Sequence, residues 1–200
     1  MVHPAPSRRL DPRLFQIAAL GSLALYGLLA LDLEIRPQVA AVLLPTVLLT
    51  QWGFSRLFHL PRFDPRSALI SGLSLCLLLR TGSLALAGAA AVVTIASKFL
   101  LRVGGKHVFN PTNIGIAVMM LLSDRVWVSP GQWARPRFFS FLLACVGFVV
   151  VTRARRADVT WAFLAAWALV LFGRAAWLGD PWQIPLHQLE NGAFLIFTFS

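Results

Sequence analysis

Apolar runs fill most of the chain, and short polar or basic segments separate them. A helix needs about 20 apolar residues, and at least about 17, to cross the core of a bilayer. Five runs reach or approach this length: 14–31, 38–54, 83–101, 137–151 and 159–178. The pattern therefore predicts an all-α polytopic membrane protein with about five full transmembrane helices, in a single transmembrane domain that covers 1–200.

Two further apolar runs are too short to cross a bilayer. The first, 67–79, ends at Arg80. The second, 114–122, follows Asn110 and Pro111, and Asn at the N-cap with Pro at the first helical position favours a helix start there. Such a helix has about 13 residues and is roughly 20 Å long. Because half-length helices with polar N-termini form ligand sites in membrane proteins, we expect short discontinuous half-helices here.

Composition agrees with a membrane protein, and the charges give an orientation. The chain is 58% hydrophobic, with a mean hydropathy of +0.72, and 13% charged, against about 25% charged in soluble domains. The formal net charge of +10 comes from basic residues between the apolar runs, so nucleic acid is not an expected partner. If each run is one passage, a cytoplasmic N-terminus places twelve of the 18 Lys and Arg residues inside. We therefore expect 1–13 to be a cytoplasmic segment.

The segment 104–113 gathers glycines and polar residues between two apolar runs: Gly104, Gly105, Lys106, Asn110, Thr112 and Asn113. Glycine amides, a lysine and a helix N-terminus together suit an anion such as phosphate. The asparagine amides and the threonine hydroxyl suit a neutral polar ring instead, or they line a solute pore. The remaining interpretation is a tight loop in which Asn110 only caps the helix. The residues leave these alternatives open.

A second polar group precedes the apolar run 193–200. His187 and Glu190 share a helix face at a spacing of three residues, and Asn191 follows them. Because a carboxylate is favourable at a helix N-terminus, we expect Glu190 to act as a cap. A metal site needs more ligands than these, and both cysteines lie in apolar runs without a Cys or His at ligand spacing. The sequence predicts neither a metal site nor a catalytic residue.

The basic residues at the ends of the apolar runs have predicted positions relative to the membrane surface. Arg80 lies between two apolar runs, where a charge needs a headgroup, an acid or a ligand. We expect it to be an interfacial arginine in a short outer loop. Lys98 and Arg102 close the run 83–101, and their side chains are expected to snorkel to the membrane surface. The tryptophan-containing segment 123–133 is expected to be an interfacial loop.

One family signature resembles the stretch GGKHVFNPTNIGIAVMMLLSDRVWVSPGQW. The family contains the D-type membrane subunit of the Rnf electron-transport complex and the B-type membrane subunit of the sodium-pumping NADH:quinone reductase. In it a glycine-containing loop with Gly-Lys leads to Phe-Asn-Pro and a short apolar helix, which correspond here to Gly105, Lys106, Phe109, Asn110 and Pro111. The ending HQLENGAFLIFTFS is similar to another short helix of the family. The best match covers about 30 of 200 residues, and the spans are compatible with one half of the family's inverted-repeat fold.

The resemblance implies a membrane-embedded flavoprotein that relays electrons between other membrane subunits in the inner membrane of a bacterium, surrounded by lipid. As an enzyme it would be at most a redox subunit of a multi-subunit oxidoreductase. Family members with covalent FMN carry a Ser-Gly-Ala-Thr motif after the Asn-Pro helix, and 127–137 lacks it. We therefore expect FMN or riboflavin to bind non-covalently. The implied ligands are Gly104, Gly105, Lys106, Asn110, Thr112 and Asn113, with Glu190 and Asn191 opposite.

Two other functions stay open. The chain is alternatively a structural or assembly subunit of a larger membrane complex that has lost the cofactor. The family fold also resembles urea-transporter-like channels, so the remaining alternative is a small-solute channel. The C-terminal half of the family fold is expected to be missing from this chain.

Overall fold

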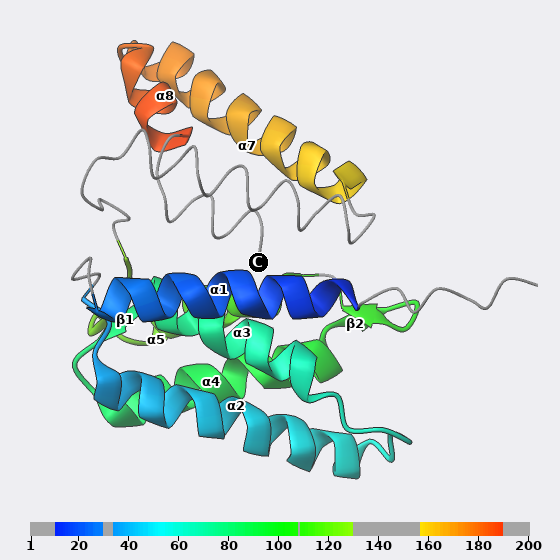
Figure 1. The fold of residues 1–200 in the computed structure, drawn as a ribbon. Helices are drawn as coiled ribbons and strands as arrows, with labels where there is room; N and C mark the ends of the chain where they lie inside the picture. Colours follow the sequence, from blue (N-terminus) through cyan, green and yellow to red (C-terminus); the bar gives the residue numbers. More distant parts are fainter. Residues whose placement is uncertain (1–10, 30–33, 108, 130–156, 190–200) are drawn as a thin grey trace, which may run out of the picture.

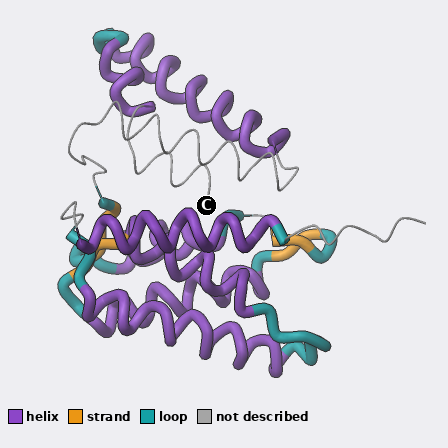
Figure 2. The backbone as a smooth tube through the Cα atoms, in the orientation of Figure 1, coloured by secondary structure: helices purple, strands orange, loops and turns teal. Residues whose placement is uncertain are grey.

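The computed structural model describes residues 11–29, 34–107, 109–129 and 157–189. Helices make up most of this part of the chain (Figures 1 and 2), and four short strands connect them. The helices are α1 (Pro12–Leu29), α2 (Pro37–Leu57), α3 (Pro65–Leu78), α4 (Leu84–Leu100), α5 (Pro111–Leu122), α7 (Ala157–Leu178) and α8 (Gln183–Leu189). The strands are β1 (Leu79–Thr81), β2 (Arg102–Val103), β3 (Lys106–His107) and β4 (Val126–Val128).

Three helices within the described residues are long and apolar enough to cross a membrane: α1, α2 and the Thr160–Leu178 part of α7. The expectation of about five full spans is thus too high for this part of the chain. The run 83–101 yields the 17-residue helix α4, which is at the lower limit for a membrane span, and a β-hairpin follows it directly. The expected span 137–151 lies outside the described residues.

Local signals set the starts of α3, α4 and α5. Asp64 accepts a hydrogen bond from the backbone N–H of Ser67 at 3.4 Å and precedes Pro65, so α3 begins there. Ser83 caps α4 in the same way, and Asn110 with Pro111 begins α5. The 12-residue helix α5 confirms the predicted half-helix, and the 14-residue helix α3 matches the other short run.

The helices α2 to α5 pack around one core, and α1 lies against α3 (Figure 1). Leu43, Leu75, Ile95 and Ile116, one from each of α2 to α5, are at most 1% exposed. Glycines let the helices approach closely, because a Cβ on Gly72 of α3 would lie 2.8 Å from Cγ2 of Val47 on α2. We call α2 to α5 the bundle.

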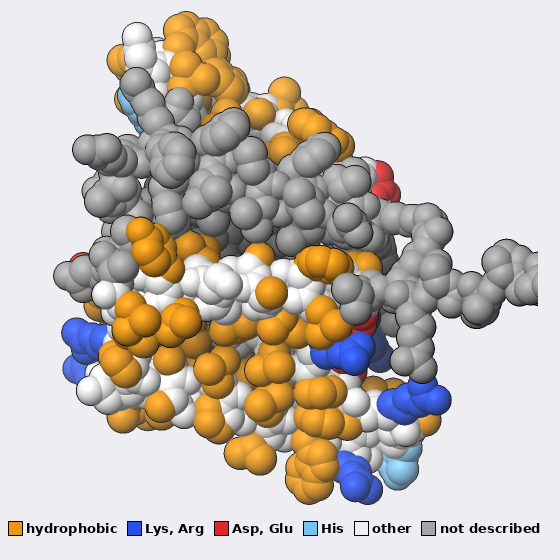
Figure 3. Space-filling model, in the orientation of Figure 1, with side chains coloured by type: hydrophobic (Ala, Val, Ile, Leu, Met, Phe, Trp, Pro, Cys, Tyr) orange, Lys and Arg blue, Asp and Glu red, His pale blue; other side chains and the backbone are white. Residues whose placement is uncertain are grey.

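Large apolar side chains cover the outside of the bundle and of α7. Figure 3 shows apolar side chains over the face between the two ends of the bundle, with Lys and Arg side chains gathered at those ends. Leu121 on α5 is 87% exposed, and Trp177 on α7 is 89% exposed. In a soluble protein such a surface would be an aggregation hazard, whereas lipid tails cover it favourably.

Candidate functional site

The two half-helices end in strands that pair with each other. α3 continues into β1 and α5 is followed by β4, and these strands run antiparallel with Arg80 opposite Trp127. The Ser129 N–H adds a 2.7 Å bond to the carbonyl of Leu78. We expected an interfacial loop over 123–133, and the structure places a paired strand within it. Away from water, a shortened helix leaves backbone N–H and C=O groups without hydrogen-bond partners. Strand pairing satisfies these groups.

Arg80 is buried at the C-terminal end of α3, not exposed in an outer loop as the sequence predicted. The residue is 5% exposed, and its Nη1 donates to the carbonyls of Cys76 at 3.1 Å and Leu79 at 2.9 Å. These carbonyls lie at the negative end of the helix dipole, which stabilises a cation. Arg80 therefore closes α3 as a side-chain cap.

The glycine pair of the predicted site forms the tip of a β-hairpin. β2 and β3 pair with Val103 opposite Lys106, which leaves Gly104 and Gly105 as a two-residue turn. Their φ angles of 58° and 78° are both positive, as a type I′ turn requires. Both glycines are exposed, and a Cβ on either would meet nothing within 4 Å. The turn alone thus explains the glycine pair, and its role in binding an anion stays a prediction.

The asparagines and the threonine lie at the start of α5. The Oδ1 atom of Asn110 accepts hydrogen bonds from the backbone N–H groups of Thr112 at 2.9 Å and Asn113 at 3.4 Å. Thr112 is 2% exposed, and the Oδ1 atom of Asn113 is buried without a hydrogen-bond partner in the described chain. The structure therefore brings Asn110, Thr112 and Asn113 together. Three other predicted ligands lie outside the described part of the chain: the Lys106 side chain, Glu190 and Asn191.

Buried polar residues that the sequence reasoning did not single out lie on α2. Its buried positions form one stripe, in which Val39, Leu43 and Val47 are followed at the same spacing by Gln51 and Ser55. The stripe changes from apolar to polar along the helix.

The other helices of the bundle show the matching change. α4 buries Ala87, Ala90 and Ala91 first, and Thr94, Ser97 and Lys98 toward its end. α5 begins with Thr112 and continues with the apolar Ile116 and Met119. Since α2 and α4 finish where α5 begins, these polar residues gather at one end of the bundle, which we call the polar end. Its buried polar cluster consists of Gln51, Ser55, Thr94, Lys98, Thr112 and Asn113.

Close contacts fix the register around Lys98. A Cβ on Gly115 would lie 1.9 Å from Oγ1 of Thr94, so α4 and α5 touch at this level. Lys98 stands one turn later on α4, next to the first turn of the antiparallel helix α5. The ring centroids of Phe54 on α2 and Phe99 on α4 are 5.2 Å apart. Lys98 therefore lies at the level where α2 finishes and α5 begins.

Lys98 is 6% exposed, so its side chain does not snorkel as expected. Several polar atoms of the buried polar cluster have no hydrogen-bond partner among the residues that the structure describes: Lys98 Nζ, Gln51 Oε1, Ser55 Oγ, Thr94 Oγ1 and Asn113 Oδ1. Nearly all buried polar atoms in proteins are paired, with protein, water or ligand. The cluster thus combines a cation, hydroxyls and amides that have hydrogen-bonding capacity left over.

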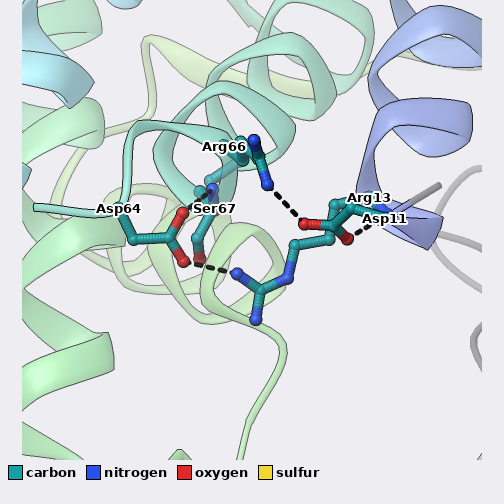
Figure 4. Close-up of polar contacts among 6 residues, drawn as sticks. Asp11, Arg13, Asp64, Arg66 and Ser67 are labelled. Carbon is teal, nitrogen blue, oxygen red and sulfur yellow. Dashed lines mark hydrogen bonds and ion pairs between the residues drawn. The ribbon is translucent and has the colours of Figure 1, made fainter. Parts of the chain in front are cut away.

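Ion pairs join the start of α1 to the start of α3 (Figure 4). Both helices start at the polar end. Arg13 Nη1 donates to Asp64 at 2.5 Å, and Arg66 Nη1 donates to Asp11 at 2.6 Å. Asp11 also accepts the backbone N–H of Arg13 at 3.0 Å. This backbone hydrogen bond, followed by the one from the Arg66 guanidinium, holds the pKa of Asp11 below its ordinary value.

Among the described residues, no group of three or more His, Cys, Asp or Glu residues is placed to hold a metal ion. Comparisons of the chain with models of protein families, with curated proteins and with solved structures find no match. Its function must therefore be argued from its own residues and from the family signature that the segment 104–113 resembles.

Proposed function

We propose that this chain is a membrane-embedded subunit of an electron-transfer complex that binds FMN or riboflavin non-covalently. The observation that carries the proposal is the buried polar cluster at the start of the half-helix α5. The resemblance of the segment 104–113 to flavin-bearing membrane subunits supports it. The partners would be other membrane subunits, to which the flavin passes electrons.

The residues at the polar end fit the polar atoms of a flavin ring. An isoalloxazine carries carbonyl oxygens, ring nitrogens that accept hydrogen bonds and one N–H that donates. The amide of Asn113 can meet a donor, while Lys98 and the hydroxyl of Thr94 can meet acceptors. The flavin would supply the one- and two-electron chemistry when bound, and the protein would supply orientation and electrostatics. Lys106 on the hairpin, with Glu190 and Asn191, completes the proposed ligand set.

Flavin release tests the proposal. The chain is purified in mild detergent together with its associated subunits, denatured, and assayed for released flavin by absorbance and fluorescence. We expect up to one flavin per chain in the wild type and a clear loss of bound flavin in Asn113→Ala. Gly53→Ala on α2 is the control, since a Cβ there meets nothing within 4 Å. A protein that assembles normally but carries no flavin would contradict the proposal.

A structural or assembly subunit is the second candidate, and the start of α5 favours it. The side chain of Asn110 accepts hydrogen bonds from the backbone N–H groups of Thr112 and Asn113. The hairpin turn alone explains the glycine pair. This alternative expects Lys106→Ala and Asn113→Ala to reduce assembly while electron flux per assembled complex stays normal. Loss of flux with intact assembly would favour the flavin-binding subunit instead.

A solute channel through the bundle is disfavoured by the apolar half of its interior. Leu43, Leu75, Ile95 and Ile116 are at most 1% exposed and fill the core beyond the polar end. A pathway for a polar solute needs polar groups that replace its hydration, and these four side chains offer none. The polar cluster therefore ends within the bundle and does not continue through it.

A further inference from the structure

We infer that Lys98 binds a phosphate group that enters the bundle at the polar end. The inference rests on the geometry around Lys98 and stands whether or not a flavin is bound. The phosphate would be inorganic phosphate, a phospholipid headgroup or the phosphate of a nucleotide such as FMN. All three present negatively charged, non-bridging phosphate oxygens, and native mass spectrometry separates them.

The ammonium group of Lys98 is buried without a counter-ion among the described residues. Lys98 is 6% exposed, and within the described residues no atom accepts a hydrogen bond from its Nζ and no carboxylate forms a salt bridge with it. A charge held this way is strongly unfavourable unless a group outside the described residues neutralises it. An anion supplies that neutralisation directly.

The charges around Lys98 are unbalanced. Asp64 attracts its ammonium group, whereas Arg13 and Arg102 repel it. The Asp64 carboxylate is already engaged, because it accepts hydrogen bonds from Arg13 and from the backbone N–H of Ser67. The positive end of the α5 dipole lies in the same region. Cations thus outnumber the carboxylate that faces them, and the local field favours an added anion.

The hydrogen-bond donors at the polar end suit a phosphate better than a simple halide. Lysine offers three N–H donors, and the Thr94 and Ser55 hydroxyls have buried oxygen atoms without partners in the part of the chain that the structure describes. Thr94 lies on the same face of α4 one turn before Lys98. A phosphate has several strong acceptor oxygens for such a set, and lysine is a common phosphate ligand in proteins.

Binding of inorganic phosphate to the delipidated protein, measured by titration calorimetry in detergent, tests the inference. We expect Lys98→Met to weaken binding by about tenfold or more, the loss expected for one charge-assisted hydrogen bond. Lys98→Arg keeps the charge and should retain most of the affinity. Arg56→Met is the matched control, because it removes an exposed cation at the same end and should change the affinity less than about twofold.

Native mass spectrometry identifies the source of the phosphate. A phosphatidylglycerol molecule that is retained by the wild type and by Arg56→Met but lost from Lys98→Met would support a headgroup. FMN that is retained by the wild type but lost from Lys98→Met would support the phosphate of a nucleotide, provided that both proteins retain riboflavin equally.

A thermal measurement covers the case in which Lys98→Met fails to fold. Protection of the wild type and of Lys98→Arg against heat by phosphate, but not by chloride, would then support the inference. If none of these ligands depends on Lys98 and phosphate protects no better than chloride, the inference is wrong. Phosphate binding in a flavin-free protein would overturn the proposed function alone.

Discussion

Asn110 caps the first turn of α5 through its side-chain oxygen. Its Oδ1 accepts hydrogen bonds from two backbone N–H groups of the first turn of α5, those of Thr112 and Asn113. We expect Asn110→Ala to destabilise the protein by about 1 kcal/mol, because both N–H groups lose this acceptor. Thermal unfolding in detergent, followed by circular dichroism, measures the change.

Asn110→Asp is the matched control, because aspartate is an equally good N-cap and its carboxylate favours the positive end of the helix. It should unfold at or near the wild-type temperature. If both variants unfold alike, the cap is not what stabilises α5.

Residue by residue, the sequence predicted what depends on local signals and missed what depends on neighbours. The start of α5 followed from Asn110 and Pro111, because a cap and a proline act within one turn. Lys98 looked like an end-of-helix lysine with a snorkelling side chain. Its burial arises from packing against α2 and α5, which residue patterns along α4 do not show.

Among the elements, α4 and α5 approach each other closely at Gly115. A Cβ on Gly115 would lie 1.9 Å from the Oγ1 atom of Thr94 and 3.0 Å from its Cα atom. Because the Cα atom belongs to the backbone, the helices must separate to accept a methyl group. We expect Gly115→Ala to destabilise the protein by about 1–3 kcal/mol, the usual effect of overpacking.

Gly53→Ala on α2 provides the comparison for this substitution. A Cβ on Gly53 meets nothing within 4 Å, so the gain in helix propensity should make the variant as stable as the wild type or more so. Unfolding temperatures of Gly115→Ala and Gly53→Ala, measured in the same detergent, show whether only the substitution at Gly115 is destabilising. Equal effects would mean that the contact of α4 with α5 is looser than the structure shows.

At the scale of elements, the apolar runs predicted α1 to α5 and α7 with shifts of a few residues at their ends. The β1–β4 pair escaped prediction, because strands of three residues carry no periodicity and their partners are distant along the chain. The same pairing explains why Arg80 is buried. A strand that continues a half-helix keeps the arginine inside the protein, where the carbonyls of Cys76 and Leu79 receive its guanidinium.

Across the whole molecule, the bundle separates an apolar middle from the buried polar cluster at the polar end, while Arg80 and Thr81 are buried at the opposite end. The apolar middle holds the helices together, while the polar end retains unused hydrogen-bonding capacity around Lys98. The division arises because α2 and α4 both become polar toward their ends and α5 is polar at its start. The sequence contains each trend separately, and only the alternating directions of the helices bring them together.

The attachment of α1 to the bundle should depend on pH, because ion pairs at the polar end join it to α3. The hydrogen bonds from Arg13 and Arg66 hold the pKa of Asp11 below its ordinary value, so folding favours its charged form. Its contribution to stability is therefore complete above the ordinary pKa of an aspartate and is lost as the pH falls through the lowered one. We expect the unfolding temperature of the wild type to fall in this acidic range, and Asp11→Asn to remove that part of the fall. Because Arg13, Arg66 and Asp64 are largely exposed, added salt should weaken the same contribution near neutral pH. An acid profile that Asp11→Asn leaves unchanged would show that other contacts alone hold α1 against α3.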